Sequence, residues 1–71
     1  MFNTETVIHL IGDPCLKLYR KGKGCWYFEF RDHEAVGTKM VLVDRLNDLA
    51  LDTWITEGRT FAAAMRAQHK L

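Results

Sequence analysis

The candidate zinc ligands of this sequence are the imidazoles of His9 and His33 and the thiols of Cys15 and Cys25. Structural zinc sites usually take their ligands from close pairs, such as two cysteines separated by two residues. Here the four residues lie singly along the chain and no close pair occurs. The spacing therefore favours two free thiols over a metal centre, and the sequence predicts no metal and no other cofactor.

Cys25 is the candidate nucleophile. Cysteine catalysis requires a base and an orienting group beside the thiol. Asp32 and His33 are of suitable types, but a strand between them and Cys25 would separate the groups by about 20 Å or more, given the rise per strand residue. We therefore expect no catalytic dyad, and the sequence predicts a protein without enzymatic activity.

Basic and tyrosine residues alternate with apolar residues between positions 15 and 31. This alternation is typical of strands with one buried and one exposed face. The polar positions would then share one exposed surface, on which tyrosine and basic side chains could contact a partner. The candidate contacts are Lys17, Tyr19, Lys21, Lys23, Tyr27 and Arg31.

The same alternation predicts a hairpin with strands at 15–21 and 25–31. Setting Leu18 opposite Phe28 places the apolar residues on one face, and a slip by one residue would scatter them. The other face then carries Lys17 opposite Glu29, Tyr19 opposite Tyr27, and Lys21 opposite Cys25. This register leaves Gly22-Lys23-Gly24 as a three-residue loop, in which Gly24 is free to adopt a positive φ.

Further strands are predicted at 6–11 and 38–43, and a helix at 51–69. The 38–43 segment is apolar at nearly every position, which favours a central or doubly covered strand, or the seam of a dimer. In the helix, Gly58 lies within the apolar stripe and should permit close approach to the sheet. That stripe has helical spacing and comprises Leu51, Trp54, Ile55, Gly58, Phe61, Ala62 and Met65.

The expected fold is α+β: an antiparallel meander of about four strands, with one long C-terminal helix packed on one face. At 71 residues the chain should form a single domain, 1–71. Ten basic and nine acidic residues give a net charge of +1, which selects no class of partner. Because there is no apolar run of membrane-spanning length and no signal-peptide pattern, we expect a cytoplasmic protein.

Two segments of the chain carry a resemblance to known proteins. Residues 22–28 have the pattern Gly-Lys-Gly-Cys-Trp-Tyr-Phe, and residues 46–54 have the pattern Leu-Asn-Asp-Leu-Ala-Leu-Asp-Thr-Trp. Together they resemble a loose group of very small proteins from phages and prophages, over roughly the last three quarters of the chain. Members often have Ser or Thr where this chain has Ala50. The resemblance implies a phage-type accessory protein acting in the bacterial cytoplasm, where such proteins commonly bind and disable a bacterial complex.

We therefore expect a protein-binding inhibitor of a bacterial enzyme or immune complex, similar to an anti-CRISPR protein, that acts by steric occlusion. Nucleic-acid binding through the same tyrosine and lysine face is one alternative, and a structural homodimer is another. A second, acidic patch could also contact a partner near the start of the helix; its residues are Asp44, Asp48, Asp52 and Glu57.

Overall fold

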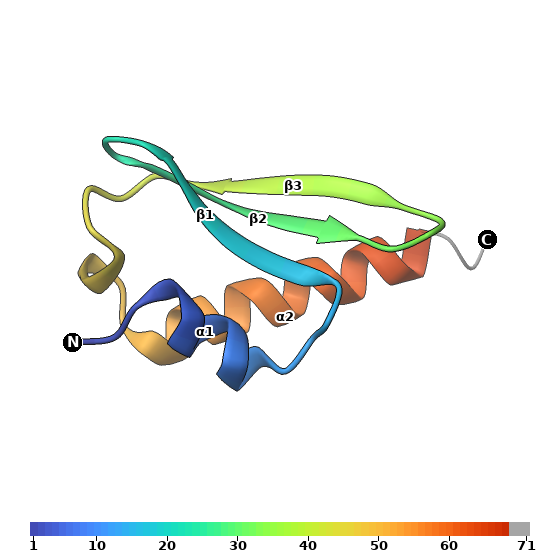
Figure 1. The fold of residues 1–71 in the computed structure, drawn as a ribbon, viewed down its shortest axis with the longest axis horizontal. Coiled ribbons are helices and arrows are strands. Elements are labelled where there is room, and N and C mark those ends of the chain that lie inside the picture. The colour runs from blue at the N-terminus through green and yellow to red at the C-terminus, as the bar shows by residue number, and fades with distance from the viewer. Residues whose placement is uncertain (69–71) are drawn as a thin grey trace.

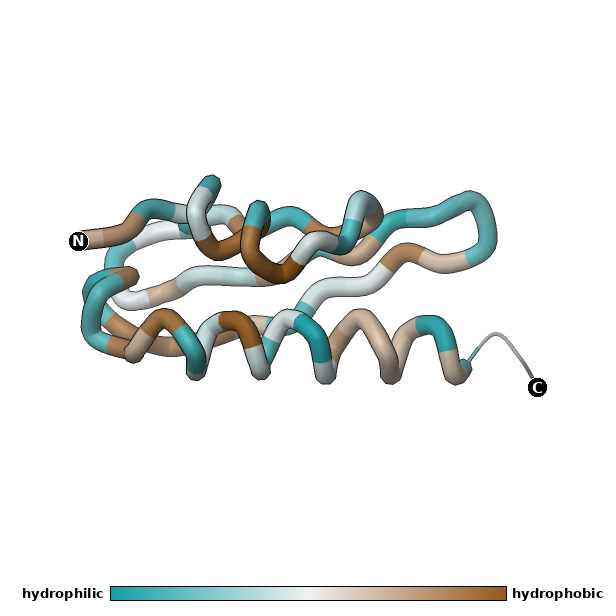
Figure 2. The backbone as a smooth tube through the Cα atoms, turned by 90° about the horizontal axis from the view of Figure 1, so that it is seen from below, coloured by the Kyte–Doolittle hydropathy of each residue, from teal (hydrophilic) through white to brown (hydrophobic). Residues whose placement is uncertain are grey.

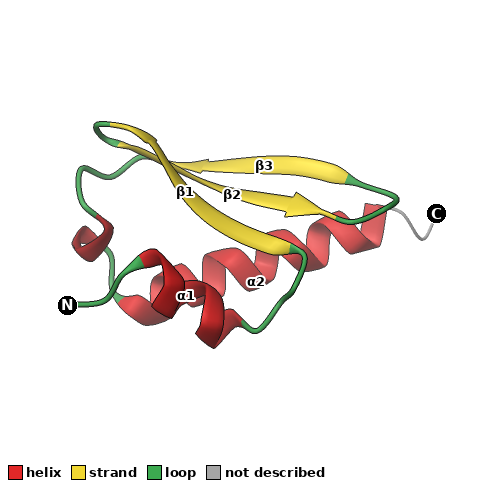
Figure 3. Ribbon diagram, in the orientation of Figure 1, coloured by secondary structure: helices red, strands yellow, loops and turns green. Residues whose placement is uncertain are grey.

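A computed structural model describes residues 1–68, which form two layers (Figures 1 and 3). The elements follow one another as helix, three strands, a short 3-10 turn and a long helix. Their bounds are α1 Thr4–Ile11, β1 Leu16–Gly22, β2 Cys25–Arg31, β3 Val36–Val41, a turn at Leu46–Asp48, and α2 Leu51–Gln68. The α+β class and the long C-terminal helix are thus confirmed, while position 69 of the predicted helix lies outside the described residues.

The sheet in this part of the chain has the strand order β1-β2-β3, and both pairings are antiparallel. Both helices lie side by side on one face of it, as the views from the side and from below show (Figures 1 and 2). No helix or strand of residues 1–68 lies on the opposite face. β2 is the central strand, and β1 and β3 are the two edges.

The predicted hairpin register is confirmed from Leu16, opposite Phe30, to Arg20, opposite Trp26. It is wrong at the turn, where Gly22 rather than Lys21 lies opposite Cys25. The register shifts between Arg20 and Gly22, so Lys21 is the extra residue of a bulge, and the connection is a turn at positions 23–24 rather than a three-residue loop. Gly24 adopts the expected positive φ, 73°.

The predicted strand at 6–11 is wrong, because this segment belongs to α1. The Asn3 side chain caps the helix by accepting hydrogen bonds from the Thr6 amide at 2.9 Å and from the Thr6 hydroxyl at 3.0 Å. Gly12 ends the helix with a φ of 74°, and its amide donates to the Ile8 carbonyl. Local capping and the burial of Val7 and Ile11, one helical turn apart, outweigh the β-branched composition.

The predicted strand at 38–43 is shifted to Val36–Val41 and lies at an edge rather than in the centre. Its apolar residues are not covered on both sides. Gly37 and Lys39 face the helices, whereas Val36 and Met40 are exposed on the other face. The four-stranded meander is therefore a three-stranded sheet in the described residues, because the first segment is helical.

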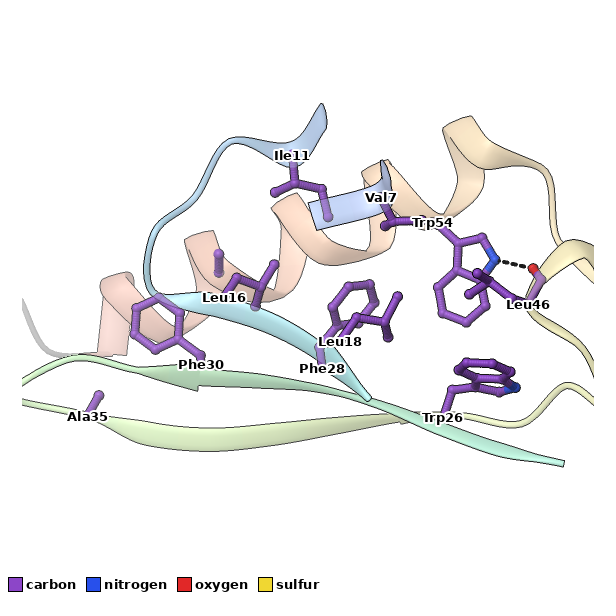
Figure 4. Close-up of a cluster of buried hydrophobic side chains, with 11 residues drawn as sticks. Val7, Ile11, Leu16, Leu18, Trp26, Phe28, Phe30, Ala35, Leu46 and Trp54 are labelled. Atoms are coloured by element: carbon purple, nitrogen blue, oxygen red, sulfur yellow. Dashed lines mark hydrogen bonds between the residues drawn. The ribbon is translucent and has the colours of Figure 1, made fainter. Parts of the chain in front are cut away.

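The core lies between the sheet and the two helices (Figure 4). Trp54, Phe28 and Phe30 are its largest fully buried side chains. The Trp54 and Phe28 rings meet edge to face, with centroids 5.9 Å apart. The Trp54 indole also donates to the Leu46 carbonyl at 2.6 Å, and the Trp26 indole donates to the Val43 carbonyl at 3.0 Å. The two indoles thus hold the connection between β3 and α2 against the core.

Gly58 is the point of closest approach between α2 and the rest of the core, as expected from the stripe. A Cβ at this position would overlap the Cδ1 atom of Ile11 on α1. It would also lie 3.0 Å from Phe28 Cε1 on β2 and 3.2 Å from Leu16 Cδ2 on β1. One glycine therefore allows α2 to pack against α1 and two strands at once.

Asp13 and Arg66 join the turn after α1 to the end of α2. The Arg66 guanidinium donates to both carboxylate oxygens of Asp13, and it stacks over Phe30 with its Cζ 5.1 Å from the ring centroid. The hydrogen bond from Arg66 lowers the pKa of the Asp13 carboxyl below its ordinary value. Asp13 also accepts the Cys15 amide at 3.0 Å, which shapes the entry to β1.

Gly58→Ala should destabilise the fold. Overpacking costs about 1–3 kcal/mol, and alanine recovers about 1 kcal/mol of helix propensity, so the difference lies between roughly 0 and 2 kcal/mol. The three close contacts place Gly58→Ala at the upper end, and we expect a net loss of about 2 kcal/mol in urea unfolding. Gly22→Ala is the matched control, because a Cβ there meets no atom within 4 Å. Equal stability of wild type and Gly58→Ala would contradict the packing described here.

Asp13→Asn should remove a pH-dependent part of the stability. Because the folded-state pKa of Asp13 is lowered, its contribution is present above the unfolded value of about 3.9 and is lost as the pH falls through the folded value. The amide can still accept from Cys15, so the variant loses mainly the charge pair, and the loss at neutral pH should be small because the Arg66 guanidinium is open to solvent. Urea unfolding of wild type and Asp13→Asn from pH 7 to pH 2 should show a difference in the free energy of unfolding that disappears in acid. A difference that does not change with pH would refute a stabilising role of the Asp13 charge.

Candidate functional site

The face of the sheet opposite the helices is the candidate site, and we call it the outer face. The strand register assigns its residues, because directly opposed residues in neighbouring strands point to the same side. They are Lys17 and Tyr19 on β1; Cys25, Tyr27, Glu29 and Arg31 on β2; and Val36, Thr38 and Met40 on β3.

An apolar and aromatic row crosses the middle of the outer face. Tyr19 lies opposite Tyr27, with ring centroids 5.3 Å apart and planes inclined at 34°. Tyr27 in turn lies opposite Met40. Tyr19 is 39% exposed and Met40 46% exposed, and Val36, on the same face of β3, is 62% exposed. The sheet thus presents large side chains to solvent from all three strands.

Charged residues surround this row unevenly. Lys17 lies opposite Glu29, and the Arg31 Nε is 4.0 Å from a Glu29 carboxylate oxygen. Lys39 belongs to the helix-facing side of β3, where its ammonium is 2.6 Å from the Glu57 carboxylate of α2. The basic residues of the outer face therefore come from β1 and β2, whereas β3 contributes only uncharged side chains to it.

The structure places four of the six predicted contacts together, since Lys17, Tyr19, Tyr27 and Arg31 share the outer face. Lys21 lies in the bulge and Lys23 in the turn beyond it. Neither lysine has an ion-pair partner within residues 1–68.

Sequence reasoning missed the contribution of β3. The signal was the alternation of Val36, Thr38 and Met40 with Gly37 and Lys39, which places the three larger neutral residues on one face. Reading the segment as uniformly apolar concealed this pattern.

The predicted acidic patch is divided by the fold. Asp48 accepts the Arg45 amide at 3.0 Å at the 3-10 turn, and Glu57 pairs with Lys39. Asp44 lies beside the hairpin turn, because a Cβ at Gly24 would be 3.3 Å from its Oδ1 atom. Asp52 is in the first turn of α2. Two of the four carboxylates thus have structural partners, which makes this patch a weaker candidate than the outer face.

Cys15 and Cys25 are both free thiols and half-buried. Within residues 1–68, no group of three or more histidine, cysteine, aspartate or glutamate side chains is placed to hold a metal ion. Neither described helix has the length and apolar character required to cross a lipid bilayer. Comparisons with protein-family models, curated proteins and solved structures gave no match.

Proposed function

We propose that this protein is a non-enzymatic binding module that docks its outer face onto another protein. The observation that carries the proposal is the row of Tyr19, Tyr27 and Met40, which spans an uncovered sheet face. Exposed apolar surface of this kind, bordered by polar residues, marks interaction sites on small soluble domains. Tyrosine, methionine and arginine are also the residue types enriched where proteins bind one another.

The packing behind the outer face supports this role. The three strands of this face are supported from behind by the core residues Phe28 and Phe30 and by the helices. A preformed surface needs little ordering when a partner binds, so less of the interaction free energy is lost. The domain is therefore suited to cover a functional surface of a larger protein and to block it sterically.

In this proposal the partner is a bacterial enzyme or immune complex in the cytoplasm, and the protein is a phage-type inhibitor similar to an anti-CRISPR protein. The choice of partner rests on the sequence resemblance of segments 22–28 and 46–54. The binding surface rests on the geometry of the sheet. The two parts can be tested separately, because the surface can be mapped with any partner that the protein captures.

Nucleic-acid binding through the same face is the second candidate, and the adjacent rings of Tyr19 and Tyr27 are the observation that favours it. Two features favour a protein partner instead. Glu29 lies in the middle of the face, where it would repel phosphates. The β3 side offers Val36 and Met40 rather than cations, whereas nucleic-acid sites require a strong positive footprint.

Affinity capture from bacterial lysate tests the surface when wild type and variants are used in parallel as baits. Tyr19→Ala with Tyr27→Ala should reduce recovery of the partner at least tenfold, because the central row is lost. Thr60→Ala with Gln68→Ala, at exposed positions of α2, should leave recovery unchanged. Circular dichroism confirms that each bait is folded.

Nuclease treatment and salt separate the two candidates. A protein partner should be retained after nuclease digestion and at moderate salt. Loss of recovery on digestion, or steep weakening with salt, would replace protein binding by nucleic-acid binding. Equal recovery by wild type and the double tyrosine variant would contradict the assignment of the outer face.

A further inference from the structure

The outer edge of β1 carries unused hydrogen-bonding groups. The Arg31 amide donates to the Cys15 carbonyl at 2.9 Å. This hydrogen bond shows that the odd-numbered positions of β1 direct their main-chain groups towards β2. Because main-chain groups alternate in direction along a strand, the amides and carbonyls of Leu18 and Arg20 point away from β2. Neither residue's main chain has a further partner in the part of the chain described here. An added strand would find these groups ready to pair.

An open groove runs beside this edge. It lies between α1 and β1, and α1 contributes Ile8, His9 and Leu10 to its lining. Lys17, Leu18 and Tyr19 of β1 form the other side. Leu10 is 44% exposed, so the groove combines free main-chain groups with apolar side chains. An extended segment lying along β1 would therefore gain packing as well as hydrogen bonds.

The edge is also basic. Lys17, Arg20 and Lys21 follow one another closely along β1, and none has an ion-pair partner in residues 1–68. The Arg20 guanidinium stacks over Trp26, with its Cζ 5.8 Å from the ring centroid, and its Nε is 3.4 Å from the Gly22 carbonyl oxygen. Among the described residues that line the groove, Glu5 is the one carboxylate.

We propose that the β1 edge binds an extended acidic segment of another protein by strand addition. Alternate side chains of such a segment point to the same side, so its acidic residues would lie near Lys17 on the outer face and its apolar residues beside Leu18 in the groove, while its backbone pairs with Leu18 and Arg20. Arg20, on the helix-facing side with Trp26, and Lys21, in the bulge, add to the positive charge of the edge. A second copy of this chain fits less well, because pairing β1 with β1 would bring two sets of these three cations together. Lys17 and Tyr19 belong to both surfaces, but the inference does not depend on the function proposed for the outer face, because its hydrogen bonds come from the main chain of Leu18 and Arg20.

The opposite edge gives a matched comparison. The same alternation directs the main chain of Thr38 outward from β3, yet the one cation of that strand, Lys39, is paired with Glu57. An acidic segment should therefore prefer β1. Proline can be accommodated at positions of edge strands whose amide faces solvent, so it can remove one donor at either edge.

The test uses two synthetic seven-residue peptides, Thr-Glu-Val-Glu-Val-Glu-Thr and its analogue with glutamine in place of glutamate. Titrations at low salt, followed by amide NMR spectra of the full chain, should show the Leu18 and Arg20 amides moving downfield and exchanging more slowly. The glutamate peptide should bind at least tenfold more tightly than its analogue. Arg20→Pro should abolish this binding, whereas Thr38→Pro should retain it.

Arg20→Ala controls for the loss of the guanidinium, since it keeps the amide; it should bind the glutamate peptide more tightly than Arg20→Pro does. Equal binding by Arg20→Pro and wild type would overturn the proposal, as would unchanged Leu18 and Arg20 amides in the wild-type spectrum. Concentration-dependent protection of these two amides without peptide would also overturn it, because a second copy would then occupy the edge.

Discussion

The close packing around Gly58 is the constraint on which the rest of the structure depends. Leu16, Phe28 and Ile11 come from three different elements and converge on this one backbone position of α2. Because the helix can approach so closely, a short chain buries Phe28 and Trp54 completely with two helices on a single face. Residues 1–68 form no third layer, and within them the other face of the sheet is left uncovered.

That arrangement leaves the domain with two exposed features of different kinds. The outer face offers side chains, centred on Tyr27, and would recognise the shape and apolar character of a partner. The β1 edge offers main-chain groups, at Leu18 and Arg20, and would recognise an extended backbone. Both are held in place by the same core, since Leu18 and Phe28 are buried directly beneath them. A partner that carries an acidic strand beside a flat surface could engage both at once.

The parts of the fold that were predictable from sequence are those fixed by local pattern. The pairing of Leu18 with Phe28 followed from period-two alternation, and the α2 stripe followed from helical spacing. Residues 6–11 were misread because β-branched composition was weighed above the capping signals, Asn3 before the helix and Gly12 after it. The position of β3 was not accessible to pattern alone, because an edge and a centre differ only in tertiary contacts.

The candidate site divides in the same way. Tyr19 and Tyr27 were identified because alternation places them on the polar face, and the structure confirms that they are neighbours. Met40 was missed as a surface residue because the 38–43 segment was interpreted as covered on both faces, and Val36 was missed because it precedes the predicted strand. Their exposure extends the apolar surface of the outer face onto β3. A surface of this kind favours a protein partner over a nucleic acid.

Hydroxyl-radical footprinting of the protein with its captured partner would show whether the outer face is the binding surface, because tyrosine and methionine side chains react readily and their oxidation is measured individually by mass spectrometry. If the outer face is the binding surface, oxidation of Tyr19, Tyr27 and Met40 should fall sharply in the complex. Met65, half-buried on α2, should be unaffected and serves as the internal reference. Protection of Met65 with unchanged oxidation of the three outer-face residues would contradict the claim and place the binding surface on the helices.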